Sequence, residues 1–409
     1  MMHATAAFAE FIRQHCFRND KTAATVMGAE LECLALNAAT LRPQPLFGRG
    51  GIIEQLRDGI SATDWKQQIN QHGIPRFHTA FGGVVTFEPG GQIEYSSPPF
   101  ASGSLLLRDL ELHAGMLERL LAPENVVLHY TGIDPFNSID VVPLQLSSAR
   151  YTNMTEYFAC IGAAGERMMR QTAALQVNIN AGPDAEKRWQ FLNRLAPVLI
   201  ALFANSRSYA CRDSGYANYR AQTWRETDPL RTGVFNGSNP IEAYAQFALR
   251  APDFLNPVAP GMYVPFEDHV RAHDEEMMAQ HLTTLFPEVR PRGWLEIRSI
   301  DTQPIHALAA PLAFIAGLVF DDGANRSAIE LLPDASESLL QEAGRYGVSA
   351  PALQPVLTDL VELALAGCTR LGQFLSSADL ERASALLRLR VSDDAVSDAA
   401  RTRPLHSQS

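Results

Sequence analysis

The chain has 409 residues, of which 46% are hydrophobic and 19% are charged, and its formal net charge is −11. This composition is typical of a globular protein with a large core. Because neutralising phosphates requires a concentrated basic face and no such run of Lys and Arg occurs, the sequence excludes a bulk nucleic-acid or membrane-surface binder. Local arginine clusters could still bind small anions.

The cysteines and the apolar segments indicate a cytoplasmic protein. The five cysteines are widely spaced and form no CxxC pair, which predicts reduced thiols. Met1 to Phe11 lacks the basic and apolar regions of a secretory signal. The longest uncharged apolar run, Ala307 to Phe320, contains Pro311 and is shorter than the roughly 20 residues that cross a bilayer, so we expect a buried core helix.

Short β-type segments alternate with long helical ones through the first three quarters of the chain. The patterns predict strands over 27–36, 83–87, 93–95, 174–180 and 294–299, and helices over 105–121, 155–171, 185–204 and 239–249. Strands separated by long helical insertions favour an α+β protein whose sheet, mostly antiparallel, is assembled from distant pieces of the chain.

The C-terminal part is predicted to be helical, with helices over 336–346, 350–366 and 377–389 and with Gly367 as the stop of the second. Residues 391–409 are polar and predict a disordered tail. We therefore expect a single domain over 1–390, of which 305–390 is the helical C-terminal part.

An acidic strand is the first segment that carries chemistry. Side chains alternate in a strand, so Glu30 and Glu32 share one face while Ala29, Leu31 and Cys33 share the other. Two neighbouring carboxylates repel each other unless a cation or an arginine lies between them, and such oxygen ligands suit Mg²⁺ or Mn²⁺. The solvated face of an edge strand would show the same pattern.

A turn flanked by acidic residues is the second segment that carries chemistry. Pro89-Gly90-Gly91 forces a tight turn, and Glu88 and Glu94 lie on either side of it, so a hairpin would bring both carboxylates to one edge. An ordinary structural hairpin is the simpler interpretation of this segment taken alone.

Two further strands carry polar side chains on one face. Gln176, Asn178 and Asn180 alternate onto one face, where amides could orient a carboxylate, an amino group or a metal. Glu296 and Arg298 also share a face, so that a metal-binding carboxylate and a phosphate-binding guanidinium could meet one ligand. A half-exposed strand and a cross-strand ion pair are the alternatives.

An arginine-rich stretch lies between these two strands in the sequence. Guanidinium groups bind carboxylates and phosphates through two parallel hydrogen bonds, and Trp224 beside them could shape a small-molecule pocket. Surface arginines are usually just solvated, but their density in an acidic chain favours an anion site. The arginines are Arg207, Arg212, Arg220, Arg225 and Arg231.

Together these segments resemble the carboxylate-amine ligase family that includes the plant-type glutamate-cysteine ligases and the bacterial ligase of ergothioneine biosynthesis. The resemblance covers roughly residues 24–304. It rests on the GxExE-type strand from Gly28, the FEPGGQxE hairpin from Phe87, QVN from Gln176, WRETDPLRTG from Trp224, and HLTTLFPEVRPRGWLEIR from His281. It implies a six-stranded antiparallel sheet forming a funnel wrapped by helices, as in glutamine synthetase and the guanido kinases.

The resemblance also implies the roles of individual residues. Arg298 and Glu296 would be catalytic, with Arg298 facing the phosphoryl group in flight, and Arg298 and His281 would contact ATP. Substrate would be bound by Arg220, Arg231, Asn178 and Trp224. Two or three Mg²⁺ ions, or Mn²⁺ in their place, would be held by Glu30, Glu32, Glu88, Glu94, Gln176 and Glu296.

The implied reaction needs no protein nucleophile. ATP converts the γ-carboxylate of glutamate to an acyl phosphate, and the amine of cysteine displaces phosphate to give γ-glutamylcysteine for ergothioneine or glutathione synthesis. Metal ions and arginine would offset the crowding of negative charge. The partners would be these small molecules only, without nucleic acid or membrane, in a monomer or homodimer.

Three alternatives remain at this point. The chain could couple glutamate or another acid to a different amine. His269 and His273, four residues apart, could bind zinc on a helix as in a metallohydrolase, although the glutamate of an HExxH motif is absent. A non-catalytic binding protein is the third, but it would be expected to have lost some of the carboxylates.

Overall fold

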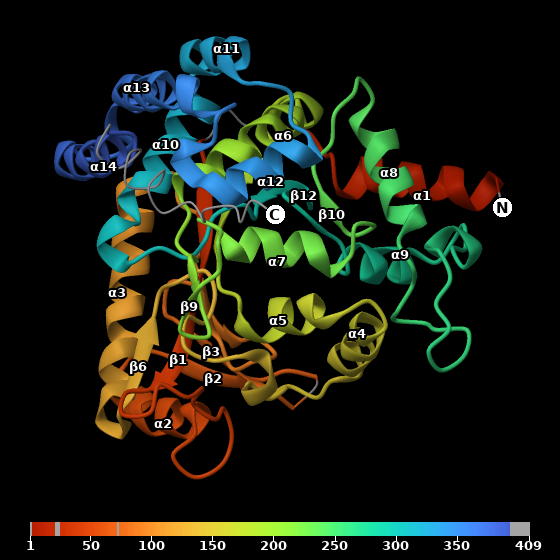
Figure 1. Ribbon diagram of the computed structural model, residues 1–409, viewed down its shortest axis with the longest axis vertical. Coiled ribbons are helices and arrows are strands. Elements are labelled where there is room, and N and C mark those ends of the chain that lie inside the picture. The colour runs from red at the N-terminus through yellow and green to blue at the C-terminus, as the bar shows by residue number, and fades with distance from the viewer. Residues whose placement is uncertain (1, 21–24, 72, 393–409) are drawn as a thin grey trace, which may run out of the picture.

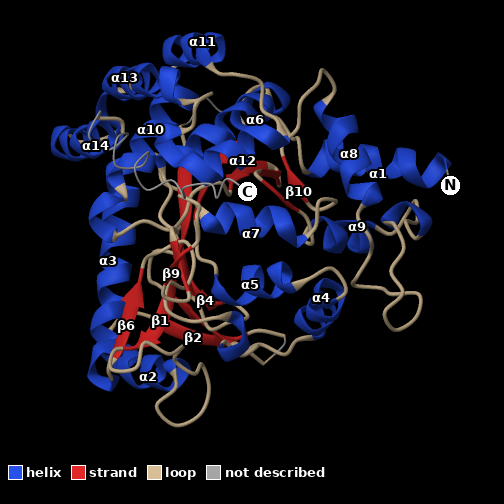
Figure 2. Cartoon of the chain, viewed as in Figure 1, coloured by secondary structure: helices blue, strands red, loops and turns tan. Residues whose placement is uncertain are grey.

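The chain folds around one large antiparallel sheet, seen as the red strands of Figure 2. The computed structural model describes residues 2–20, 25–71 and 73–392. Nine strands form the sheet in the order β12-β13-β7-β1-β5-β4-β3-β2, and β6 pairs with the far end of β1. These strands are β1 (Met27–Asn37), β2 (Lys66–Ile69), β3 (Pro75–His78), β4 (Val84–Phe87), β5 (Ile93–Ser96), β6 (Val126–His129), β7 (Leu175–Asn180), β12 (Val289–Pro291) and β13 (Trp294–Ile297).

The expected antiparallel sheet wrapped by helices is confirmed, but it has nine strands rather than six. Every predicted strand is present within a residue or two of its bounds. The unpredicted strands β2, β3, β6 and β12 are only three or four residues long, which is too short for a period of two to stand out. Pairing with longer neighbours, rather than their own sequence, makes them strands.

Helices surround the sheet, and most predicted helices are present. The prediction over 155–171 is wrong in one respect, because the segment is two helices separated at Gly162, whose φ of 154° few other residues adopt. The helices are α1 (Met2–His15), α2 (Ile52–Gly59), α3 (Gly103–Leu121), α4 (Ala149–Ala159), α5 (Ala163–Gln171), α6 (Ala185–Leu202), α7 (Tyr219–Thr227), α8 (Pro240–Arg250), α9 (Glu275–Leu282), α10 (Ala309–Phe320), α11 (Asp322–Leu331), α12 (Glu337–Tyr346), α13 (Gln354–Arg370) and α14 (Ser377–Arg390). Two small sheets pair β8 (Ser208–Tyr209) with β9 (Arg212–Asp213), and β10 (Thr232–Gly233) with β11 (Phe286–Pro287).

The two faces of β1 meet different surroundings. Ala29, Leu31 and Cys33 belong to the main hydrophobic core, into which α3 and α6 also pack. A second, smaller core contains Met154 of α4 and Met168 of α5. In Figure 1, α4 and α5 lie well away from α3. The charged side chains on the other face of β1 therefore lie between the sheet and the helices of the smaller core, where they can be buried.

The helical C-terminal part expected over 305–390 consists of α10 to α14. The apolar run from Ala307 forms the buried helix α10, as predicted, and Figure 1 shows α10, α13 and α14 gathered at one end of the molecule. The predicted tail lies almost wholly outside the described residues, which end at Ser392. Among the described residues no single helix is long and apolar enough to cross a membrane, although two bent helix pairs reach that length and hydropathy together.

Gly367 is not the helix stop that its sequence suggests, because α13 continues to Arg370. It is instead one of two glycines where α13 and α10 approach closely. A Cβ on Gly367 would collide with the carbonyl oxygen of Gly317, and a Cβ on Gly317 would collide with that of Ala364. The two helices therefore cross backbone to backbone, a distance that only glycine permits.

We expect Gly317→Ala to lower the free energy of unfolding by about 1–3 kcal/mol, because the added methyl group forces α10 and α13 apart. Chemical denaturation would measure the change. The matched control is Gly115→Ala in α3, where a Cβ meets only the end of Arg119 and should stabilise the helix slightly. Equal unfolding midpoints in both variants would contradict this account.

Candidate active site

Four glutamates line one cavity of about 250 Å³ on the polar face of the sheet. Glu30 and Glu32 come from β1, Glu94 from β5, and Glu88 from the turn before it. The register pairs Glu32 with Glu94 across the sheet, and the turn closes as expected, with the Glu88 amide donating to the carbonyl of Gln92. Residues that are 64 positions apart in sequence are thus brought to one surface by antiparallel pairing.

The polar face of β7 lies beside these carboxylates. Gln176 donates to Glu32 Oε1 at 2.9 Å, and Asn178 donates to Glu30 Oε1 at 3.1 Å. Gln176 lines the acidic cavity, whereas Asn178 lines a neighbouring cavity of about 420 Å³ that shares Glu30 with it. There Asn178 also accepts a hydrogen bond from the Trp294 indole at 3.0 Å.

Burial and mutual repulsion make these carboxylates hard to ionise. Burial, and then the charges of Glu94 and Glu296, raise the pKa of Glu30 to about 8, and burial with the charge of Glu32 raises the pKa of Glu94 to about 7. The pKa of Glu88 is likewise raised, whereas burial raises that of Glu32 against the opposing charge of Arg220. The cluster therefore favours protons or added cations.

Glu296 is placed differently, because three arginines surround its carboxylate. It pairs with Arg290 at 2.6 Å, with Arg292 at 2.9 Å and with Arg298. These charges outweigh burial and hold the pKa of Glu296 well below its usual range. Glu296 does not line the acidic cavity, unlike the other residues that were predicted to hold the metal.

The guanidinium of Arg298 does reach the cavity, and Gln176 Oε1 accepts from it. Arg290 lines the cavity as well, so the ion pairs with Glu296 fix two guanidinium groups opposite the carboxylates. Burial lowers the pKa of Arg298, but Glu296 opposes this effect. Positive and negative side chains thus line the same cavity.

Arg150 of α4 is a site residue that sequence reasoning missed. It lines the cavity and donates to Thr283 Oγ1 at 2.5 Å, and it has no ion pair among the described residues. A single arginine at the start of a helix carries no pattern in the sequence. Only the packing of α4 against the residues after α9 brings it to the site.

The remaining wall of the cavity is apolar. It is formed by Trp224, which was predicted to bind substrate, and by Phe286 and methionines of α4 and α5, which were not predicted. The guanidinium carbons of Arg298 and Arg220 lie 5.2 and 5.8 Å from the Trp224 ring centroid. The methionines are Met154, Met168 and Met169. The cavity therefore combines a charged half with a soft, apolar half.

Two predicted substrate arginines lie behind the wall. Arg220 is buried and donates to the carbonyl oxygen of Arg298 at 2.9 Å. Arg231 is fully buried, lies 3.1 Å from Asp228 and donates to Thr284 Oγ1 at 2.8 Å. Neither lines the cavity, so in this structure both support it and neither contacts its interior.

The structure does not place the predicted histidines at the site. His281 is buried, stacks on Phe266 with ring centroids 3.8 Å apart and has Nε2 2.8 Å from the carbonyl oxygen of Ala248, and it does not line the acidic cavity. Burial lowers its pKa to about 4. His269 and His273 precede α9 in a turn rather than on one helix face, and His269 lies 3.5 Å from Asp253, so the helical spacing that the zinc alternative needs is absent here.

The donor chemistry of the acidic cavity suits a hard divalent cation, since it offers four carboxylates and one amide oxygen with excess negative charge. In the described part of the chain, however, no three His, Cys, Asp or Glu side chains are close enough together to hold an ion. Their oxygens are directed at protein donors instead, as at Glu94, which accepts from Thr86 at 2.9 Å and Ser96 at 3.1 Å.

Comparison with known proteins identifies the family. A family model described as glutamate-cysteine ligase family 2 matches residues 26–403. The chain is 33% identical to glutamate-cysteine ligase EgtA of Mycolicibacterium smegmatis over 75% of this chain and 74% of that protein, and 28% identical to the chloroplastic glutamate-cysteine ligase of Solanum lycopersicum over 85% and 70%. A glutamate-cysteine ligase from Francisella tularensis in complex with AMP has the same fold, with a TM-score of 0.52 at 10% identity over 95% of this chain and 86% of that one. The chain belongs to the glutamate-cysteine ligase family and is a carboxylate-amine ligase.

Proposed function

We propose that this enzyme joins the γ-carboxylate of glutamate to the amine of cysteine with ATP, through a γ-glutamyl phosphate, to give γ-glutamylcysteine. The observation that carries the proposal is the cavity that is lined by four carboxylates and by Arg298, Arg290 and Arg150. Such a combination of charges suits a reaction in which a triphosphate and a carboxylate must approach each other.

Glu30, Glu32, Glu88, Glu94 and Gln176 are the residues proposed to hold Mg²⁺, which would neutralise the phosphates and polarise the transferring phosphoryl group. The raised pKa values of Glu30 and Glu94 support this role, because a group that resists ionisation when the cavity is free of cations gains most from a cation. Binding would require the carboxylates to exchange their present hydrogen-bond donors for the metal.

Arg298 is proposed to stabilise the phosphoryl group during transfer, and Glu296 to position it. Glu296 aligns three guanidinium groups, and a planar guanidinium gives two parallel hydrogen bonds to adjacent oxygens. Arg150, which has no carboxylate partner of its own among the described residues, is proposed to bind a substrate carboxylate. No side chain needs to act as a nucleophile.

The two ends of the site are proposed to receive different molecules. Trp294 and Asn178 border the cavity that shares Glu30, where an aromatic ring beside the metal ligands suits a nucleotide base. The methionine and Trp224 wall suits the short thiol side chain of cysteine, since thioethers and rings pack well against sulfur. Another small amine remains the second candidate acceptor.

The similarity to bacterial EgtA and to the plant enzymes supports a place in ergothioneine or glutathione synthesis. The free cysteines are consistent with a reducing, cytoplasmic setting.

The proposal is tested by incubating the purified chain with Mg²⁺, ATP and glutamate, and then adding cysteine or one of a panel of other amines. We expect ADP release to depend on cysteine and γ-glutamylcysteine to appear in the mass spectrum. Stimulation by a different amine alone would keep the chemistry and change the acceptor. No ADP release with any acid and amine pair would refute the ligase proposal.

We expect the stability of the metal-free protein to fall as pH rises from about 4.5 to about 8. Glu30 and Glu94 hold protons more tightly when folded than when unfolded, so ionising them stabilises the unfolded chain. Mg²⁺ should therefore raise Tm strongly at pH 8 and little at pH 5, as measured by thermal unfolding with and without EDTA.

The variants Glu30→Gln and Glu94→Gln should flatten this pH dependence and reduce the gain in Tm from Mg²⁺, while turnover falls at least about a hundredfold. Glu124→Gln, at an exposed position after α3, is the matched control. If Mg²⁺ stabilises the control and the two variants equally, the assignment of these carboxylates to a metal is wrong.

Arg298→Lys should lower kcat by about 10²–10³-fold, because an ammonium cannot reproduce the planar fork. The control is Arg292→Lys, which alters the same Glu296 ion pairs at a side chain that is 42% exposed and does not line the acidic cavity. Its turnover should fall less than about tenfold. Similar losses in both variants would mean that Arg298 acts only by holding Glu296.

A further inference from the structure

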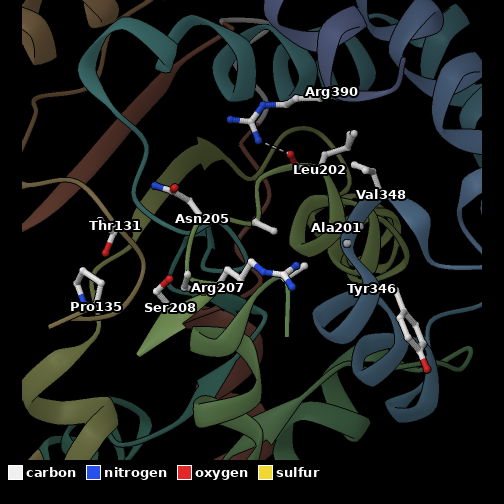
Figure 3. A pocket seen from close by; sticks show the side chains of 14 residues that line it. Thr131, Pro135, Ala201, Leu202, Asn205, Arg207, Ser208, Tyr346, Val348 and Arg390 are labelled. Atoms are coloured by element: carbon white, nitrogen blue, oxygen red, sulfur yellow. Dashed lines mark hydrogen bonds between the residues drawn. The ribbon is translucent and has the colours of Figure 1, made fainter. Parts of the chain in front are cut away.

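A third cavity, of about 480 Å³, lies outside the site described above and shares no lining residue with it. Figure 3 shows its walls: Arg390 of α14 enters from one side, Asn205, Arg207 and Ser208 from the loop after α6, and Tyr346 with Val348 from the end of α12. A cavity of this size matches those that enclose small molecules.

The charge of this cavity is positive. Among the residues that the structure describes, two arginines and no acidic side chain line it. Arg207 is paired with Asp213 at 2.6 Å, but Arg390 has no ion pair among the described residues. Its guanidinium donates to two neutral acceptors, the carbonyl oxygen of Leu202 and Gln303 Oε1, both at 2.6 Å.

Burial makes this charge unfavourable and lowers the pKa of Arg390 to about 10, although the nearby charge of Asp301 opposes the effect. An anion in the cavity would relieve that penalty with a charge-assisted hydrogen bond. Much of the remaining lining is apolar, from Ala201, Leu202, Ala204 and Val348, so the anion must carry a compact apolar body. A carboxylate or phosphate attached to a small ring or chain has this chemistry.

The cavity is connected to the active-site arginine by a short chain of buried contacts. The amide of Asn205 and the hydroxyl of Ser206, both on the cavity wall, donate to Asp301 Oδ2 at 2.8 and 2.7 Å. Asp301 lies 3.7 Å from Arg220, and Arg220 donates to the carbonyl oxygen of Arg298 at 2.9 Å.

This chain of contacts is incomplete at its centre. Asp301 Oδ1 is buried without a hydrogen-bond partner in the structure, and so is Nε of Arg220. Asp301 and Arg220 are 3.7 Å apart, so a small shift of the loop could bring this ion pair within hydrogen-bond distance. Such a shift would move Arg220 and with it the backbone that carries Arg298.

We propose that this cavity is a regulatory site for a small organic anion, a carboxylate or a phosphate, held by Arg390, and that its occupancy changes turnover through Asp301 and Arg220. The binding part stands independently, whereas the effect on turnover rests on the proposed ligase function.

Binding is tested by calorimetry with benzoate and phenyl phosphate as probes and with neutral benzamide as their uncharged counterpart. Wild-type protein should bind one or both anions and not benzamide, which distinguishes a carboxylate site from a phosphate site. Arg390→Gln should weaken binding by about tenfold or more, while Arg388→Gln, on the same helix but paired with the exposed Glu362, should bind like wild type. Equal binding by Arg390→Gln, or binding of neither anion, would overturn the proposal.

A second variant guards against misfolding of Arg390→Gln. Val348→Phe keeps the arginine but fills the cavity, and it should also abolish binding. Saturating probe should change the rate of ADP release at least about twofold in wild type and in Arg388→Gln, and not in Val348→Phe. Binding at Arg390 without any change in turnover would refute the regulatory part of the proposal. If the protein releases no ADP even without a probe, the ligase proposal is wrong instead.

Discussion

The repulsion among four carboxylates in one small cavity is the constraint on which the rest of this structure depends. Glu30, Glu32, Glu88 and Glu94 line one small cavity, and burial together with mutual repulsion raises their pKa values. Stability does not explain this cluster, because an apolar surface in its place would cost less free energy of folding. The cluster is explained when a cation and an anionic substrate complete the balance of charge.

Glu296 lies on β13, two strands away from β1 in the sheet, and has the opposite arrangement of charge. One carboxylate with three arginines carries excess positive charge, and this excess is directed at the cavity through Arg290 and Arg298. The two groups are complementary in sign, so each lowers the electrostatic cost of the other. Arg298 is also the point where the proposed regulatory chain from Asp301 and Arg220 ends, at its carbonyl oxygen.

Alternation along strands was the part of the site that could be predicted from the sequence. Glu30 and Glu32 share a face because any strand at that position would place them so, and the Pro89-Gly90-Gly91 turn brings Glu88 and Glu94 to one edge by local geometry alone. The same reasoning predicted the polar face of β7 and predicted that Glu296 and Arg298 share one face of their strand. The five main strands and the buried helix α10 followed from equally local patterns.

What the sequence could not determine was which polar residues face the cavity and which support it from behind. Arg220, Arg231 and His281 have the same chemistry as cavity residues, but packing buries them in the wall, whereas Arg150 and the methionines of α4 and α5 reach the interior without any sequence signal. Gly367 has the pattern of a helix stop, yet contact with Gly317 makes it a crossing point. The sequence by itself determined secondary structure, the face of each strand and the family resemblance, because these depend on neighbours in the chain. Only the tertiary structure decided burial, ion pairing and the shape of the cavities, because these depend on contacts between residues far apart in sequence.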